Sequence, residues 1–416
     1  MEFSAFGKRY TRHTGARELM DDLGEAMSRD TPVMMLGGGN PAHIPEVLDL
    51  LAERLHTIAD TPRELRRMLA DYASPAGELR FREALASLLQ REYGWPVSVD
   101  NVALTAGSQG AFFLLFNLLA GDFADGSRRQ VLLPLTPEYV GYSDLGLQDE
   151  LFIARRPAIE HLDNRQFKYH VDFDGLQAGD GVGAICVSRP SNPTGNVLTD
   201  DEVSRLAGLA READVPLILD NAYGLPFPQI VFTDAKPYWD DNVILCMSLS
   251  KLGLPAVRTG IVIGRPEVVE ALTGLNAVLS LAVSSVGAVL ARELVESGRI
   301  IELSRDVIRP FYQGRAQQAV AWLHESLAGC EYFVHRPEGA LFLWLWLPEL
   351  PITSAELYSR LKKRDVYVLP GHHFFPGLAD DWPHKHQCLR LSYAQDLDAV
   401  RRGIAILGKE VRRLSS

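Results

Sequence analysis

Short apolar runs alternate with longer amphipathic stretches from about residue 101 onward. The runs are rich in branched apolar residues, as β-strands are, and turns containing glycine, proline or asparagine separate them from the stretches with helical periodicity. The pattern predicts helices over 108–119 and 200–213, and strands over 102–105, 131–135, 184–188, 216–220, 243–247 and 260–264. This order is typical of an α/β domain with a mostly parallel sheet.

The pattern changes after about residue 300. A long helical stretch precedes the apolar run 342–347, a loop rich in proline, glycine and histidine, and a closing helix. That helix has one apolar face, formed by Leu397, Val400, Ile404, Leu407, Val411 and Leu414. We therefore predict a large domain over residues 51–300 and a small domain built from residues 1–50 and 301–416.

The composition narrows the class of protein. Hydrophobic residues make up 47% and charged residues 23% of the chain, which is average for a folded globular protein. The net charge of -11 would repel nucleic acid and anionic membranes, so we expect neither as a partner. The longest apolar stretches, 111–120 and 277–291, are too short to cross a bilayer and predict buried helices. Four scattered cysteines and a polar amino terminus predict a cytoplasmic protein.

A lysine follows the predicted strand 243–247, within the sequence Ser248-Leu249-Ser250-Lys251. Burial would lower the pKa of this lysine and so favour the neutral amine, which is the form that makes a Schiff base. The two serines and Arg258 could bind a phosphate group, and the guanidinium would give a planar bidentate contact. Taken alone, the motif fits a solvated lysine after a strand equally well.

Polar residues also follow two other predicted strands. Asp220 ends the run 216–220 and precedes Tyr223, and Asn192 lies in an Asn-Pro-Thr-Gly turn after the run 184–188. A carboxylate at Asp220 could hold the proton of a pyridine nitrogen, while Tyr223 and Asn192 could donate to the ring oxygen of the same cofactor. Each segment alone is also typical of a helix cap or a plain turn.

Together and in this order, these segments resemble the hallmarks of fold type I pyridoxal phosphate (PLP)-dependent aminotransferases of class I and II. The resemblance covers essentially the whole chain. It implies the aspartate aminotransferase-like PLP-dependent transferase fold, with a mostly parallel seven-stranded sheet in the large domain and a smaller α+β domain. It also implies a homodimer with shared active sites, and transfer of amino groups between amino acids and 2-oxo acids.

The resemblance also assigns the site residues. It implies that PLP forms a Schiff base with Lys251, and that Lys251, Asp220 and Tyr223 are the catalytic residues. Tyr139 would stack on the pyridine ring, and Tyr72 would reach the cofactor phosphate of the neighbouring subunit. The expected cofactor contacts are Gly107, Ser108, Gln109, Tyr139, Asn192, Asp220, Tyr223, Ser248, Ser250, Lys251, Arg258 and Tyr72. The expected contacts of the substrate carboxylate are Gly39, Asn192 and Arg390.

Three stretches, 36–41, 246–255 and 370–378, are similar to a bacterial subgroup of the family that acts on valine and pyruvate. This resemblance implies a ping-pong reaction of valine, alanine and 2-aminobutyrate with pyruvate and 2-oxoisovalerate. No further arginine lies in a motif for a distal carboxylate, although Arg189 and Arg336 lie near site segments.

Two other functions remain open. A PLP-dependent lyase or synthase would use the same residues. A PLP-sensing regulator of transcription would need an amino-terminal DNA-binding extension, and we expect too little chain before Gly37-Gly38-Gly39 to hold one.

The loop after residue 370 contains four histidines. No cysteine, aspartate or glutamate stands at a familiar ligand spacing beside His372, His373, His384 and His386. We therefore expect no metal site, and we expect the loop to border the substrate pocket.

Overall fold

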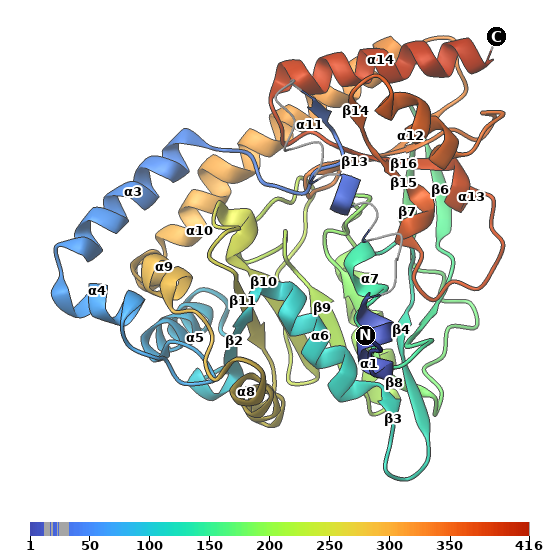
Figure 1. Cartoon of the computed structure of the whole chain (residues 1–416). Helices are drawn as coiled ribbons and strands as arrows, with labels where there is room; N and C mark the ends of the chain where they lie inside the picture. The colour runs from blue at the N-terminus through green and yellow to red at the C-terminus, as the bar shows by residue number, and fades with distance from the viewer. Residues whose placement is uncertain (12–16, 18–19, 23, 25–32, 416) are drawn as a thin grey trace.

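The structure, a computed structural model, describes residues 1–11, 17, 20–22, 24 and 33–415. The described residues form two large β-sheets and one two-stranded sheet, with helices packed around them (Figure 1). The amino-terminal part contributes α1 (Ala5–Thr11), β1 (Met34–Met35), α3 (Pro45–Ala59), α4 (Pro62–Leu69) and α5 (Leu79–Tyr93). Of these, α3 and α4 project from the side of the molecule (Figure 1).

The larger sheet has the strand order β2-β11-β10-β9-β8-β4-β3, and β5 also pairs with β4. Its members are β2 (Val102–Ala106), β3 (Gly121–Asp122), β4 (Arg128–Leu133), β5 (Phe152–Ala154), β8 (Val182–Ser188), β9 (Leu217–Asp220), β10 (Val243–Ser248) and β11 (Thr259–Ile263). The six predicted strands are all present within a few residues. The sheet is mostly parallel, as predicted, and β11 is antiparallel to both of its neighbours.

The described residues form eight strands in this sheet instead of the expected seven. The additional strand is β3, a pair of residues that lies antiparallel to the start of β4. Two residues carry no hydrophobic periodicity, so a sequence pattern cannot indicate such a strand.

Helices cover the sheet, which explains why its inner strands are continuously apolar. Every residue of β8, β9 and β10 is buried. The predicted helices are present as α6 (Gly107–Leu119), which contacts β2, β10 and β11, and α7 (Asp200–Glu212), which contacts β8 and β9. Two more helices, α8 (Pro266–Ser280) and α9 (Val286–Glu296), contact β2 and α5 respectively.

The second sheet has the order β15-β16-β13-β12-β7-β6. Its strands are β6 (Ala158–Leu162), β7 (Gln166–His170), β12 (Phe333–His335), β13 (Phe342–Trp346), β15 (Leu369–Pro370) and β16 (Cys388–Ser392). The hairpin of β6 and β7 comes from the chain range that we assign to the large domain, and it pairs with β12 in parallel. The second sheet therefore contains strands from both of the predicted domain ranges. The division into two domains stays a prediction.

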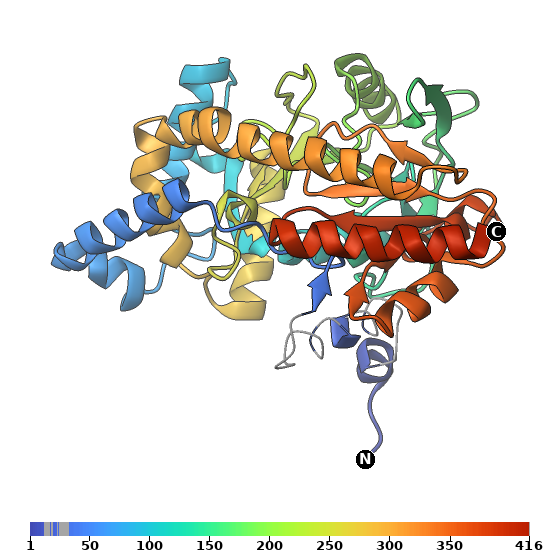
Figure 2. The same cartoon turned by 90° about the horizontal axis from the view of Figure 1, so that it is seen from above.

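Two long helices, α11 (Arg309–Ser326) and the predicted closing helix α14 (Leu397–Ser415), run side by side along the second sheet (Figure 2). The buried residues of α14 include Val400, Ile404, Leu407 and Val411, as its apolar face predicts. The remaining elements are η1 (Val99–Asn101), η2 (Val140–Tyr142), η3 (Leu249–Leu252), α10 (Arg299–Leu303), η4 (Ser304–Ile308), α12 (Ser354–Lys362), β14 (Val366–Tyr367), η5 (Gly371–Phe374) and α13 (His384–Gln387).

The two long apolar stretches behave differently. Residues 111–119 lie in α6, as predicted, and bury Ala111, Phe112, Leu114, Leu115 and Phe116. The prediction for residues 277–291 was wrong, because this stretch is the end of α8, an irregular turn and the start of α9. Leu281 ends the helix with a positive φ of 65° and a ψ of -51°, and Val278 is 84% exposed. No helix in the described part of the chain is long and apolar enough to cross a membrane.

Candidate active site

The carboxyl ends of the parallel strands meet at one edge of the larger sheet, and this edge holds the predicted site. Ser188 and Cys246 are both in register with Asp220 across neighbouring strands. A cavity of about 170 Å³ opens there, at the position where open α/β sheets bind ligands. The predicted residues that line it are Gly39, Ser108, Gln109, Tyr139, Asn192, Asp220, Tyr223, Ser248, Ser250, Lys251, Arg258 and Arg390.

Lys251 lies on the short helix η3, which begins directly after β10. Its Nζ donates a hydrogen bond of 2.7 Å to the carbonyl of Gly39 and lies 5.3 Å from the ring centroid of Tyr223. Burial, followed by the nearby cations Arg390 and Arg258, lowers the pKa of Lys251 to about 8. Roughly a tenth of this amine is therefore neutral at pH 7, far more than of a free lysine, and the neutral form is the one that nucleophilic chemistry requires.

Asp220 ends β9 and is 6% exposed. Its carboxylate accepts one hydrogen bond of 2.7 Å from the hydroxyl of Tyr142 and one of 2.9 Å from the backbone N–H of Ala222. Burial raises the pKa of Asp220 to about 6, while these two donors and Lys251 act in the opposite direction. Asp220 is thus a buried carboxylate at neutral pH that faces the cavity. Burial also raises the pKa of the neighbouring Tyr223, which keeps its hydroxyl protonated.

A second group of donors surrounds the start of α6. A Cβ on Gly107 would lie 2.1 Å from Nη2 of Arg258, so the guanidinium packs directly against the glycine, whose φ is 74°. Arg258 contacts the Ser250 hydroxyl at 3.4 Å and the Pro255 carbonyl at 3.3 Å, and none of the described carboxylates forms an ion pair with it. Free helix amides, two hydroxyls and an arginine without a carboxylate partner form a donor set that suits a phosphate.

Arg390 lies on β16, at the other side of the cavity, and is 4% exposed. Its Nη1 donates to the side-chain oxygen of Asn192 and its Nη2 to the carbonyl of Gly37, both at 2.7 Å. The guanidinium lies 4.0 Å from the ring centroid of Phe342 and 5.3 Å from that of Phe374. Its buried Nε has no hydrogen-bond partner among the described residues. A buried cation that lacks a carboxylate partner suits an anionic ligand.

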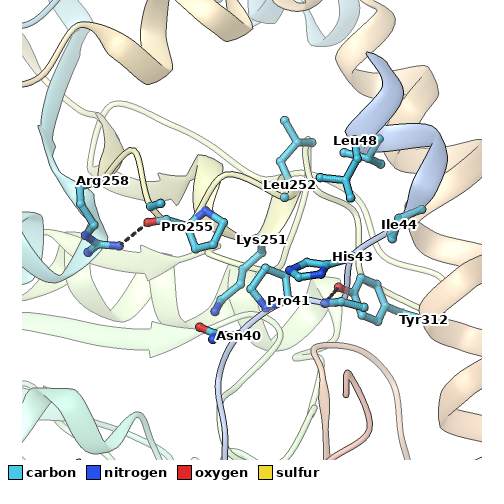
Figure 3. Close-up of a pocket in the computed structure, with 14 residues that line it drawn as sticks. Asn40, Pro41, His43, Ile44, Leu48, Lys251, Leu252, Pro255, Arg258 and Tyr312 are labelled. Carbon is cyan, nitrogen blue, oxygen red and sulfur yellow. Dashed lines mark hydrogen bonds between the residues drawn. The ribbon is translucent and has the colours of Figure 1, made fainter. Parts of the chain in front are cut away.

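A larger cavity of about 490 Å³ adjoins the first and shares Lys251 and Arg258 with it. Figure 3 shows the Lys251 side chain extending toward Asn40, beside Pro41. The hydroxyl of Tyr312 accepts a 2.8 Å hydrogen bond from the backbone N–H of Ala42 and so anchors this loop to α11. The loop that follows Gly39 therefore forms one wall of the space around Lys251.

Two predicted residues do not line the cavity, Gly107, which packs against the Arg258 guanidinium, and Tyr72. Tyr72 follows α4 and is 85% exposed, and it does not line either cavity. The expected role of Tyr72 requires a second subunit, so the assignment stays a prediction.

The histidine loop lies close to the second sheet. His372 stacks near His373 and His386, at centroid separations of 3.9 and 5.7 Å. His384 is buried against the Tyr169 hydroxyl and the ring of Trp382. Within the described residues, no three His, Cys, Asp or Glu side chains lie together as a metal site would require.

Sequence reasoning missed several residues around the site. Tyr142 donates to Asp220, Glu138 accepts the backbone N–H of Ser188, and Phe342 and Phe374 pack against the Arg390 guanidinium. Leu369 also lines the cavity. Their only sequence signal is proximity to motif residues, as Glu138 and Tyr142 flank Tyr139.

Comparison with known proteins finds relatives that match nearly the whole chain. The chain is 47% identical to valine–pyruvate aminotransferase of Escherichia coli strain K12, over 99% of both chains. A putative amino-acid aminotransferase from Psychrobacter arcticum 273-4 has a similar structure, with a TM-score of 0.97, 45% identity and coverage of 100% of this chain and 99% of that one.

Valine–pyruvate aminotransferase from Salmonella typhimurium LT2 has a TM-score of 0.89 and 46% identity, and the match covers 96% of this chain and 99% of that one. The sequence model of aminotransferase class I and II matches residues 31–407. The chain therefore belongs to the class I and II aminotransferases and is a transaminase.

Proposed function

We propose that this transaminase uses PLP and exchanges the amino group between small apolar L-amino acids, such as valine, alanine and 2-aminobutyrate, and the 2-oxo acids pyruvate and 2-oxoisovalerate. The observation that carries the proposal is the convergence of Lys251, Asp220 and Arg390 on one cavity. An amine of lowered pKa, a buried carboxylate and a buried guanidinium are the three groups that amino-group transfer to and from a carboxylic acid requires.

The donor set around the cavity fits the cofactor. Ser108, Gln109, Ser250 and Arg258 would hold the phosphate, and the close packing of Gly107 against Arg258 leaves no room for a side chain there. Tyr139 would lie against the ring, with Asn192 and Tyr223 near the ring oxygen and Asp220 at the pyridine nitrogen. When bound, PLP supplies an aldehyde that condenses with amines and a ring that withdraws electrons.

The protein residues then have distinct tasks. Arg390 binds the substrate carboxylate through charge-assisted hydrogen bonds and so fixes the α-carbon relative to Lys251. The neutral amine of Lys251 takes the proton from the α-carbon of the amino acid in one half-reaction and delivers a proton to that carbon in the other. Asp220, as a carboxylate, holds a proton on the ring nitrogen throughout.

The cavity lining supports small apolar substrates. Met20, Val140 and Leu369 contribute apolar side chains to it. The two arginines that could have bound a distal carboxylate have other partners, since Arg189 pairs with Asp200 at 2.6 Å and Arg336 pairs with Glu338. Among the described residues that line the cavity, the arginines are Arg258 and Arg390. We assign Arg258 to the cofactor phosphate and Arg390 to the substrate α-carboxylate.

We expect the enzyme to react with alanine and valine at least about tenfold more efficiently than with glutamate, because burial of an unpaired distal carboxylate costs at least a few kcal/mol. Single-turnover measurements with the PLP form give the rate constant over Kd for each amino acid. A glutamate value equal to or above that of alanine contradicts the small-apolar substrate class. Product analysis with and without pyruvate separates amino-group transfer from the chemistry of a PLP lyase or synthase.

We further propose a homodimer in which Tyr72 contributes to the active site of the partner. Exposed apolar side chains support this, because Leu69 and Tyr72 lie near one end of α4, and Val278, Leu279 and Leu281 near the end of α8. A 2.9 Å hydrogen bond from Asn276 to the Pro75 carbonyl links these two regions. Exposed apolar side chains that lie close together are typical of subunit interfaces. We expect a dimer mass in sedimentation equilibrium, and a monomer at micromolar concentration would contradict the shared site.

A further inference from the structure

A chain of hydrogen-bonding groups extends behind Asp220, away from the cavity. The Tyr142 hydroxyl, on η2, donates to Asp220 at 2.7 Å and lies 3.4 Å from the Ser188 hydroxyl at the end of β8. The Ser188 hydroxyl is 2.5 Å from the carboxyl of Glu138, which also accepts the Ser188 backbone N–H at 2.8 Å. The most exposed of the four side chains is Asp220, at 6%.

These hydrogen-bonded groups are anchored by the segment after β15 and by α6, so their geometry is fixed by the fold. The backbone N–H of Glu138 donates to the Phe374 carbonyl at 2.8 Å, which ties it to the loop after β15. The Tyr142 ring packs edge-on against Phe112 and Phe116 of α6, at centroid separations of 5.0 and 5.1 Å. The Tyr142 hydroxyl is therefore held toward Asp220 by packing of its ring against α6.

The position of one proton decides the direction of these hydrogen bonds. When Glu138 is protonated, it can donate to Ser188, Ser188 to Tyr142, and Tyr142 to Asp220, so that all three hydrogen bonds stabilise negative charge on Asp220. When Glu138 is ionised, Ser188 donates to it instead, and two carboxylates share a buried site, which is unfavourable. Burial raises the pKa of Glu138 to about 8 and that of Asp220 to about 6, so near neutral pH the proton resides on Glu138.

We propose that Tyr142 is a positioning residue that keeps Asp220 ionised, and that Ser188 and a protonated Glu138 orient its hydroxyl. This inference rests on the proposed use of PLP, because it concerns the residue at the pyridine nitrogen. Other titratable groups face the pair: Lys251 on η3, Tyr139 and Tyr223, whose hydroxyls burial keeps protonated, and the thiols of Cys186 on β8 and Cys246 on β10. Burial raises the pKa of both thiols, so they stay neutral and do not compete for the charge.

The test is the binding of pyridoxine 5'-phosphate to the apoprotein across about pH 5 to 8. This compound has the ring nitrogen and the phosphate but no aldehyde, so Lys251 cannot react with it. Binding weakens as the pH falls through the pKa of Asp220, because the pyridinium loses its carboxylate partner. Titration of the phosphate itself is the same for every variant. Differences in the pH dependence of binding between variants therefore measure changes in the pKa of Asp220.

We expect Tyr142→Phe to shift the acid limb of binding upward by about one to two pH units, because a lost hydrogen bond to a charged group raises the pKa of Asp220 by that amount. At pH 7 the Kd then rises about twofold to tenfold. Ser188→Ala shifts the limb in the same direction by a smaller amount. Glu138→Gln, which is uncharged and can still donate, keeps the midpoint of the wild type.

The control is Tyr332→Phe, which removes a buried hydroxyl bonded to His324 at 2.7 Å in a different part of the fold. It should leave the acid limb unmoved. An unmoved limb in Tyr142→Phe would overturn the role of Tyr142, and a downward shift in Glu138→Gln would show that Glu138 is ionised and overturn its proposed proton. Failure of the wild-type apoprotein to bind pyridoxine 5'-phosphate would instead contradict the proposed cofactor.

Discussion

Replacement of Lys251 by alanine is expected to lower the rate of amino-group transfer from alanine to 2-oxoisovalerate at least about a thousandfold. The Lys251 amine lines the cavity and its pKa is lowered to about 8, whereas the methyl group of alanine can neither form a Schiff base nor move the α-proton. Loss of a positioned acid–base group alone costs about a hundred to ten thousandfold.

The matched control for this variant is Lys409→Ala, which removes an exposed lysine on α14. It should retain the wild-type rate. Both variants are measured as kcat and as single-turnover rates with saturating PLP. More than about a tenth of the wild-type rate in Lys251→Ala would exclude this lysine as the acid–base group.

Replacement of Asp220 by asparagine is expected to slow the transfer at least about a hundredfold, which corresponds to roughly 2.7 kcal/mol of barrier. An amide has nearly the same shape and can still accept from Tyr142, but it carries no charge to hold the pyridinium proton. The PLP content of the purified variant shows whether binding survives. Asp214→Asn is the control, because Asp214 is exposed and its φ of 54° is one that asparagine tolerates. Wild-type activity in Asp220→Asn would remove Asp220 from its proposed role.

Much of the site could be predicted because its residues lie where strands end. Asn192, Asp220 and Lys251 each follow an apolar run, and parallel strands bring their carboxyl ends to one edge. Strand periodicity and motif order thus locate these side chains before any coordinates are known. Arg390 was assigned by resemblance alone, since nothing in its local pattern distinguishes a buried cation from a surface one.

The residues that could not be predicted act across distant parts of the chain. The hydrogen bond from Tyr142 to Asp220 joins residues 78 positions apart, and Phe374 reaches Arg390 from a different loop. Such contacts depend on the register of the sheet and on the packing of α6, which no local periodicity encodes. The same reason applies to the hairpin of β6 and β7. Its pairing with β12 joins strands that are far apart in the sequence, and local periodicity does not encode such pairing.

The exposure of the apolar residues near Tyr72 could not be predicted from the sequence either. A run such as 277–291 predicts burial, and within a single subunit Val278 and Leu281 remain in solvent. The apolar pattern does not indicate whether a residue is covered by its own chain or by a second copy. The proposed dimer would resolve this difference between pattern and structure.

Reduction of the purified protein with borohydride tests the cofactor assignment at its covalent link. Borohydride converts a Schiff base between PLP and a lysine into a stable secondary amine, and peptide mapping by mass spectrometry then locates the modified residue. We expect the label on Lys251, with loss of visible absorbance near about 410 to 430 nm, and no label in Lys251→Ala. A label on another lysine, or a protein that carries no reducible PLP after reconstitution, would contradict the assignment of Lys251 as the PLP-binding residue of this aminotransferase.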